Sequence, residues 1–172
     1  MIKLLDLLKE VGEGTAKKYP WTFEGETETG FGLHLDYEFV TDLKTRYFVK
    51  LIVGLYDEDV YEMTIDFGVN KSALKNIIGD KKPFATVVNK GELYRVLATV
   101  LDIVKDAIQK SNEKGHTIKY LIFKPEQEKE TETGYVQSDQ RLRLYKAYLD
   151  KNKDLIQSTR TSPQGGVEAT LK

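Results

Sequence analysis

The sequence predicts an α+β fold in which an antiparallel β-meander is followed by a helix, a strand and a further helix. Three observations lead to this prediction. Residues 19–68 alternate apolar and polar side chains with the period of two that is typical of half-buried strands. Residues 89–115, and again residues 138–152, carry apolar side chains at helical spacing. Because the strand patterns come first and the helical patterns follow, strands and helices are segregated along the chain.

The first element is a short amphipathic helix, "MIKLLDLLKE", within residues 1–12. Ile2, Leu5 and Leu8 recur at the spacing of one helical face, and Gly12 follows where a helix commonly ends. About ten residues form a marginal helix in isolation. We therefore expect residues 1–12 to be a targeting or docking helix that binds a partner.

Residues 17–152 are expected to form a single α+β domain. "YPWTFEGETETGFGLHLDYEFV" contains two strand patterns, and "TRYFVKLIVGLY" and "DVYEMTIDFG" supply a third and a fourth. The short polar links between them have turn chemistry, so the four strands are expected to pair in chain order. Residues 69–90 give a mixed pattern and are expected to be a connection.

The strongest helix pattern follows this connection. Asn89 with Glu92 forms a capping-box arrangement at its start, and Gly115 follows its end. Residues 117–123, "TIKYLIF", predict a central strand, and Ser138 is placed to cap a last helix. The inward face of that helix is expected to carry Leu142, Tyr145, Tyr148 and Leu149. Residues 153–172 are rich in Ser, Thr and Gly and are expected to be a disordered tail.

Composition excludes several classes of function. The chain has 172 residues, a formal net charge of -1 and no cysteine. A balanced charge is untypical of a dedicated nucleic-acid binder, and the lack of cysteine removes disulfides and zinc–thiolate sites. The sequence has no apolar run of the roughly 18 residues that a membrane-spanning helix needs. We therefore expect neither nucleic acid nor a membrane as a partner.

Few residues form a pattern that points to catalysis or metal binding. His34 and His116 do not stand at the spacing of a two-histidine phosphoesterase, and we interpret them as structural residues. The pentapeptide "ETETG" occurs at 26–30 and again at 130–134, and alternating carboxylates of this kind can hold a hard cation. The simpler interpretation is two solvated hairpin segments, and no metal is expected.

A small basic group near the last helix is a candidate anion site. A phosphate-bearing ligand would bind such side chains together with the N-terminus of that helix. The alternative is an ordinary polar helix face. The residues are Arg141, Arg143 and Lys146.

The second half of the chain resembles part of a GNAT-type N-acetyltransferase. The resemblance rests on "VLDIVKDAIQKSNEKGHTIKYLIFKP" followed by "RLRLYKAYL", over about 60 residues. It implies a GNAT-like topology, acetyl-CoA as the ligand and a tyrosine general acid at Tyr145. In that family a glycine-rich loop at the helix N-terminus binds the pyrophosphate, and here the corresponding stretch is "NKGELYRV" with Gly91.

The N-terminal segment is similar to the capsid-targeting peptides of internal head proteins in T-even-type tailed bacteriophages. Those peptides end in a Leu-x-Glu or Ile-x-Glu site for the prohead protease, and Leu8-Lys9-Glu10 matches that site. The body resembles uncharacterised phage proteins, with "ELYRVLATVLDIVKDAI", "IKYLIF" and "RLRLY" in that order.

These patterns leave three functional hypotheses. The first is a phage-encoded, non-enzymatic accessory protein of the host cytoplasm and the virion interior, which binds head proteins through Ile2, Leu5 and Leu8 and is cut after Glu10. This hypothesis requires no cofactor. The second is an acyltransferase that uses acetyl-CoA and Tyr145. The third is a small binding protein that inhibits a host factor or sequesters a signalling nucleotide.

Overall fold

The computed structural model describes residues 17–69, 90–123, 134–161 and 166–172, with the side chains of 90–93 and 134–141 excepted. The expected helix at 1–12 and nearly all of the expected connection at 69–90 lie outside these residues. The described elements, in chain order, are β1 (Trp21–Thr29), β2 (Gly32–Val40), β3 (Arg46–Asp57), β4 (Val60–Gly68), α3 (Lys90–Glu113), β5 (Ile118–Phe123), α4 (Gly134–Lys151), β6 (Ile156–Thr161) and β7 (Val167–Leu171).

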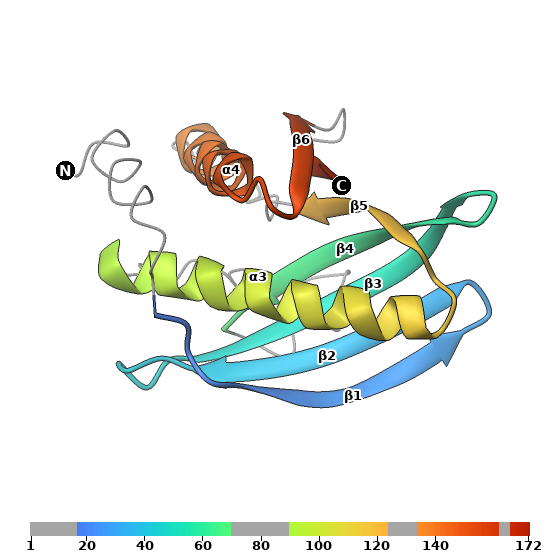
Figure 1. The fold of residues 1–172 in the computed structure, drawn as a ribbon. Helices are drawn as coiled ribbons and strands as arrows, with labels where there is room; N and C mark the ends of the chain where they lie inside the picture. Colours follow the sequence, from blue (N-terminus) through green and yellow to red (C-terminus); the bar gives the residue numbers. More distant parts are fainter. Residues whose placement is uncertain (1–16, 70–89, 124–133, 162–165) are drawn as a thin grey trace.

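The strands form one mixed sheet in the order β1-β2-β3-β4-β5-β7-β6 (Figure 1). The first four strands pair antiparallel in chain order, which confirms the predicted meander. β4 and β5 are parallel, and β7 lies between β5 and β6 with antiparallel pairing on both sides. The predicted α+β class is confirmed. The sheet is larger than expected, because β6 and β7 extend it beyond β5.

The alternation in the sequence places one face of the sheet under the helices. In β2 the buried side chains are Leu33, Leu35, Tyr37 and Phe39, every second residue of the strand. α3 lies across β2, β3 and β5, and α4 lies against β6 and β7 (Figure 1). The two helices and the sheet enclose a core that includes Leu51, Ile65, Ile103, Leu121 and Leu149.

The long helix follows its sequence pattern closely. α3 buries Val96, Val100, Val104 and Ala107 on one face, as the helical spacing predicts. It begins at Lys90, directly after the expected cap position at Asn89. Gly115 follows its end with a φ of 85°, a left-handed conformation that glycine adopts without the steric penalty of a side chain.

The last helix begins earlier than predicted. α4 starts at Gly134 rather than near Ser138, so the final residue of the second "ETETG" copy belongs to the helix. Residues 130–133 lie outside the described part of the chain. The inward face is as expected, with Leu149 buried and Leu142, Tyr145 and Tyr148 partly buried against the core.

The expected disordered tail at residues 153–172 is wrong. Ile156–Thr161 and Val167–Leu171 are strands of the sheet, and the side chains of Val167, Ala169 and Leu171 are buried. On the opposite face of β7, Glu168 accepts a hydrogen bond of 2.8 Å from Arg160 of β6. The stretch is rich in polar residues because β6 is an edge strand whose side chains are mostly exposed.

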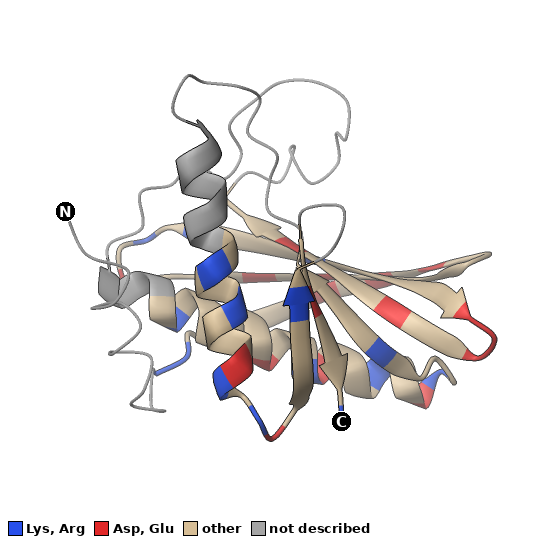
Figure 2. Ribbon diagram, turned by 90° about the horizontal axis from the view of Figure 1, so that it is seen from above, with Lys and Arg blue, Asp and Glu red and all other residues tan. Residues whose placement is uncertain are grey.

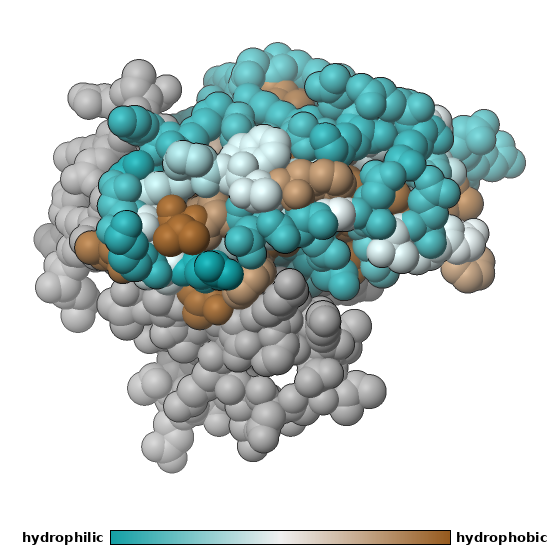
Figure 3. All heavy atoms as spheres, turned by 90° about the horizontal axis from the view of Figure 1, so that it is seen from below, coloured by the Kyte–Doolittle hydropathy of each residue, from teal (hydrophilic) through white to brown (hydrophobic). Residues whose placement is uncertain are grey.

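The surface of the described residues is mixed in charge and mostly hydrophilic. Figure 2 shows acidic and basic residues on both helices and along the strands. From below, the described surface is largely hydrophilic with small separate hydrophobic patches (Figure 3). No helix in the described part of the chain combines the length and apolar character needed to span a membrane.

Candidate functional site

The carboxyl ends of the parallel strands β4 and β5 mark the candidate site. α3 connects these two strands, and they pair from Tyr61 opposite Ile118 to Ile65 opposite Phe123. β4 then continues to Gly68 beyond the last pair. In sheets with parallel strands joined by a crossover helix, ligands bind outside the carboxyl ends of the strands. The topology therefore points to this end of the β4–β5 pair.

An aromatic cluster occupies this position. The ring of Tyr145 on α4 lies 5.9 Å from the ring of Phe67 on β4 and 6.1 Å from that of Phe123 on β5, measured between centroids. Tyr94 and Leu97 of α3 are buried against Leu144 in the same region. Three elements that are far apart in the sequence thus converge on Tyr145.

A small apolar pocket lies beside this cluster. It measures about 10 Å³, roughly the space of one water molecule. Burial raises the pKa of Tyr148 above its usual value, and a hydrogen bond with Asn152 offsets part of that rise. The Tyr148 hydroxyl therefore carries its proton at neutral pH. The pocket is lined by Leu97, Val100, Leu101, Phe123, Tyr145, Tyr148 and Leu149.

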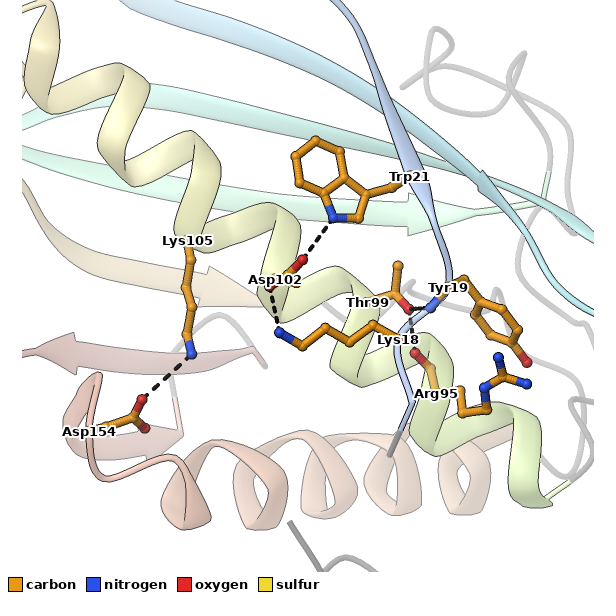
Figure 4. A network of polar contacts seen from close by, with 8 residues as sticks. All are labelled: Lys18, Tyr19, Trp21, Arg95, Thr99, Asp102, Lys105 and Asp154. Atoms are coloured by element: carbon orange, nitrogen blue, oxygen red, sulfur yellow. Dashed lines mark hydrogen bonds and ion pairs between the residues drawn. The ribbon is translucent and has the colours of Figure 1, made fainter. Parts of the chain in front are cut away.

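A second group of polar contacts fastens the start of the described chain to α3 (Figure 4). Asp102 accepts hydrogen bonds from Lys18 Nζ at 2.6 Å and from Trp21 Nε1 at 2.8 Å. The Tyr19 backbone N–H donates to Thr99 Oγ1 at 2.9 Å. We call Lys18, Tyr19, Trp21, Thr99 and Asp102 the N-terminal clamp.

Arg95 extends this clamp. Its guanidinium carbon lies 3.9 Å from the centre of the Tyr19 ring, and its Nε donates to the Lys17 carbonyl oxygen at 2.7 Å. It also forms an ion pair with Asp42. Lys105 on the same helix pairs with Asp154 at 3.5 Å. These contacts are structural, since they fix the chain from Lys17 onward on the surface of α3.

The predicted partner-binding and processing residues belong to the N-terminal segment. Ile2, Leu5, Leu8 and Glu10 lie outside the described residues. The targeting and processing predictions therefore stay predictions.

The predicted anion-binding group is described only in part. Arg143 is exposed on α4, and Lys146 forms an ion pair of 2.9 Å with Asp150. Asp150 also accepts a hydrogen bond from Thr159 of β6, so Lys146 takes part in the packing of α4 on β6. The side chain of Arg141 lies outside the described residues. The anion site stays a prediction.

The two histidines lie in separate surroundings. His34 is on β2, opposite Thr27 and Ile52. His116 precedes β5 and stacks on Tyr61, with ring centroids 4.5 Å apart. Within the described ranges, no cluster of three His, Asp or Glu residues could hold a metal ion.

The first "ETETG" copy has a structural partner. Lys114, just after α3, forms ion pairs with Glu26 at 2.8 Å and with Glu28 at 2.7 Å. Glu26 and Glu28 thus bind a lysine ammonium group that links β1 to the end of α3. The pKa of Glu28 is lowered by the Lys114 hydrogen bond and charge.

The sequence identified Tyr145 but not its aromatic neighbours. Phe67 and Phe123 fit their strand patterns, and nothing local distinguishes them from other core residues. Both residues are aromatic and lie at the ends of their strands. That shared position indicates a site only when the two strands are known to be parallel neighbours. No protein-family model, curated protein or solved structure matches this chain.

Proposed function

We propose that the domain binds a coenzyme A thioester at the carboxyl ends of β4 and β5 and transfers its acyl group to an amine. The observation that carries this proposal is the position of Tyr145 between Phe67 and Phe123, at the end of a parallel strand pair joined by α3. The order of meander, long helix, strand and helix is also the order that the resemblance to GNAT-type acetyltransferases implies.

Tyr145 would act as the general acid. When an amine attacks the thioester carbonyl carbon, a new C–N bond forms, the C–S bond breaks, and the thiolate that leaves takes up a proton. The Tyr145 hydroxyl would supply that proton, and the attacking nitrogen would lose its own proton to solvent. The apolar side chains around Tyr145 lower the local dielectric constant, which strengthens hydrogen bonds to the developing charge.

α3 supports the binding of the phosphate groups. It is 24 residues long and begins at Lys90. The first backbone N–H groups of a helix have no partner within it, and the helix dipole favours negative charge at that end. The described part of this end contributes Tyr94 and Leu97 to the candidate site, so a ligand bound beside Tyr145 would lie close to these amides.

The pocket beside Tyr145 must enlarge before a ligand can bind there. A space of about 10 Å³ does not admit an acyl group. Binding therefore requires α4 to separate from the ends of β4 and β5, which would break the ring contacts of Tyr145. The energy of those contacts would be subtracted from the affinity, as in any site that must open before it binds.

Thermal unfolding with and without ligand tests the binding step. At 1 mM acetyl-CoA, a dissociation constant of about 10 μM would add about 2.7 kcal/mol to the stability. For a chain of this size we expect the melting temperature to rise by roughly 5–10 °C. No rise at 1 mM would refute the proposal.

A pair of variants tests the chemical step. Tyr145→Phe should keep the rise in melting temperature and lose the release of free thiol in the presence of a panel of primary amines. Tyr148→Phe removes a hydroxyl one helical turn away in the same pocket and should keep both. Equal thiol release by Tyr145→Phe and the unaltered protein would exclude Tyr145 as the general acid.

A second proposal concerns residues 1–12 and rests on the amphipathic stretch with Leu8-Lys9-Glu10. We propose that this segment binds phage head proteins and directs the chain from the host cytoplasm into the assembling virion, where cleavage follows Glu10. The N-terminal clamp begins at Lys18, beyond that cut, so its contacts with α3 would persist in a chain that starts at Val11.

Mass spectrometry of purified virions tests the second proposal. A mass that lacks residues 1–10 is the expected result. A full-length mass in virions would reject the cleavage, and absence from virions would reject the packaging. Leu5→Asp combined with Leu8→Asp should abolish packaging without unfolding the domain, and an unfolded double variant would instead place the segment in the core.

A further inference from the structure

One end of the sheet exposes large apolar side chains from two neighbouring hairpins. The last pair of β2 and β3 is Gly32 opposite Gly54, so the next positions across the two strands are Phe31 and Leu55. Phe31 is 88% exposed and Leu55 is 58% exposed. Exposed apolar side chains that lie together and are bordered by polar residues are a feature of protein interaction sites.

The backbones of β2 and β3 approach closely at this end of the sheet. A Cβ atom on Gly32 would lie 1.8 Å from the carbonyl oxygen of Val53, so β2 and β3 approach closely where Phe31 leaves the sheet. Tyr56, which is 48% exposed, follows Leu55, and its ring lies 4.6 Å from that of Tyr120 on β5. Because the Tyr56 ring already packs on Tyr120, it loses little conformational entropy when it binds a partner.

Acidic residues surround this end. Asp57 is the last residue of β3, Glu58 and Asp59 form the turn to β4, and all three are exposed. Figure 2 shows this turn in the colour of acidic residues. Within the described part of the chain, none of these three carboxylates forms a salt bridge. Lys114, just after α3, is paired with Glu26 and Glu28 of β1. We call Phe31, Leu55, Tyr56 and residues 57–59 the acidic tip.

We propose that the acidic tip is a docking surface for a protein partner whose contact surface has an apolar pocket bordered by Lys and Arg. Phe31 enters the pocket as the central anchor, and residues 57–59 pair with the basic border. Hot spots of protein interfaces are often aromatic residues that insert into a pocket of the partner. Complementary charges around them steer the two proteins together. The same negative charge repels lipid headgroups and nucleic acid, which carry phosphates, and so favours a protein.

Photo-cross-linking from the full chain, in the cells that naturally make it, tests this proposal. A photoreactive phenylalanine, such as p-benzoylphenylalanine, replaces Phe31 in one variant. In the control it replaces Leu43, which is 63% exposed in the turn at the opposite end of β2 and β3. We expect a cross-linked protein from position 31 and none from position 43. No cross-link from position 31, or a cross-link to lipid, nucleic acid or a second copy of this chain, would overturn the proposal.

The identified partner is then titrated against two further variants of the acidic tip. Phe31→Ser, and Asp57→Lys with Glu58→Lys and Asp59→Lys, should each weaken binding at least tenfold, while Leu43→Ser should leave it unchanged. The unfolding midpoints of the Phe31 and Leu43 variants should stay the same, because these side chains are exposed. Asp57 accepts a hydrogen bond from the Glu58 N–H, and Asp59 has a φ of 42°, so the charge reversal is compared with Asp57→Asn combined with Glu58→Gln and Asp59→Asn. This control removes the charge and keeps the turn chemistry, and it should also weaken binding. A partner whose affinity does not respond to the charge reversal would also overturn the proposal.

Discussion

Removal of residues 153–172 should unfold the domain. The deletion takes away both β6 and β7 and exposes the edge of β5. Ile156, Val167 and Leu171 are almost completely buried, and burial of such side chains contributes roughly 1.5–3 kcal/mol each, about 5–9 kcal/mol together. A typical domain is stable by only about 5–15 kcal/mol in total. The truncated chain should therefore show no cooperative unfolding at 25 °C.

Urea denaturation followed by far-ultraviolet circular dichroism measures this effect, and a graded pair of point variants supports it. Leu171→Ala creates a cavity in the core and should cost about 2–5 kcal/mol. Thr161→Ala, on an exposed position of β6, should change the stability by less than about 0.5 kcal/mol. If the truncated chain unfolded at the same urea concentration as the intact chain, β6 and β7 would not belong to the folded domain.

Three further predictions follow from the described contacts. Burial raises the pKa of Asp102, but hydrogen bonds from the clamp more than offset this and hold it below its usual 3.8. The ionised Asp102 carboxylate thus contributes to stability above pH 4, and this contribution is lost as the pH falls through the lowered pKa. The free energy of unfolding of Asp102→Asn should therefore depend less on pH between pH 5 and 2 than that of the unaltered protein. Gly32→Ala should cost about 1–3 kcal/mol in denaturant titrations, because its Cβ meets the Val53 carbonyl, whereas Gly54→Ala on the paired residue has open space. A chain without residues 1–10 should keep the melting temperature of the full chain in calorimetry, and a fall of more than a few degrees would show that this segment is part of the core.

The sequence predicted the elements whose pattern is strong and local. β2 and β3 carry uninterrupted alternation, and α3 carries a long apolar stripe bounded by Gly115, so each element is determined by its own residues. The course of the chain after α4 could not be predicted in this way. β7 is five residues long, and its alternation of Val167, Ala169 and Leu171 is short and contains a small residue. Its strand character comes from pairing with β5 and β6, which no local pattern reveals.

The candidate site was likewise predicted only in part. Tyr145 could be singled out because the resemblance to GNAT-type acetyltransferases implies a general acid at this position. Phe67 and Phe123 become its neighbours through the parallel pairing of β4 and β5. Pairing partners separated by more than 50 residues depend on the whole topology, so a single sequence identifies one member of this cluster and not the cluster.

The position of β5 has a consequence for the order in which the protein folds. β1 to β4 are joined by short turns, and β6 and β7 form one hairpin, so these pairings are local and can form within microseconds. In the described sheet, β5 lies between the two groups, with a parallel contact to β4 and an antiparallel one to β7. Both junctions close long loops, which makes them the slow events. We therefore expect the pairing of β5 to limit the rate of folding. Leu121→Ala, at the buried centre of this strand, should slow refolding more than an equally destabilising substitution in the meander.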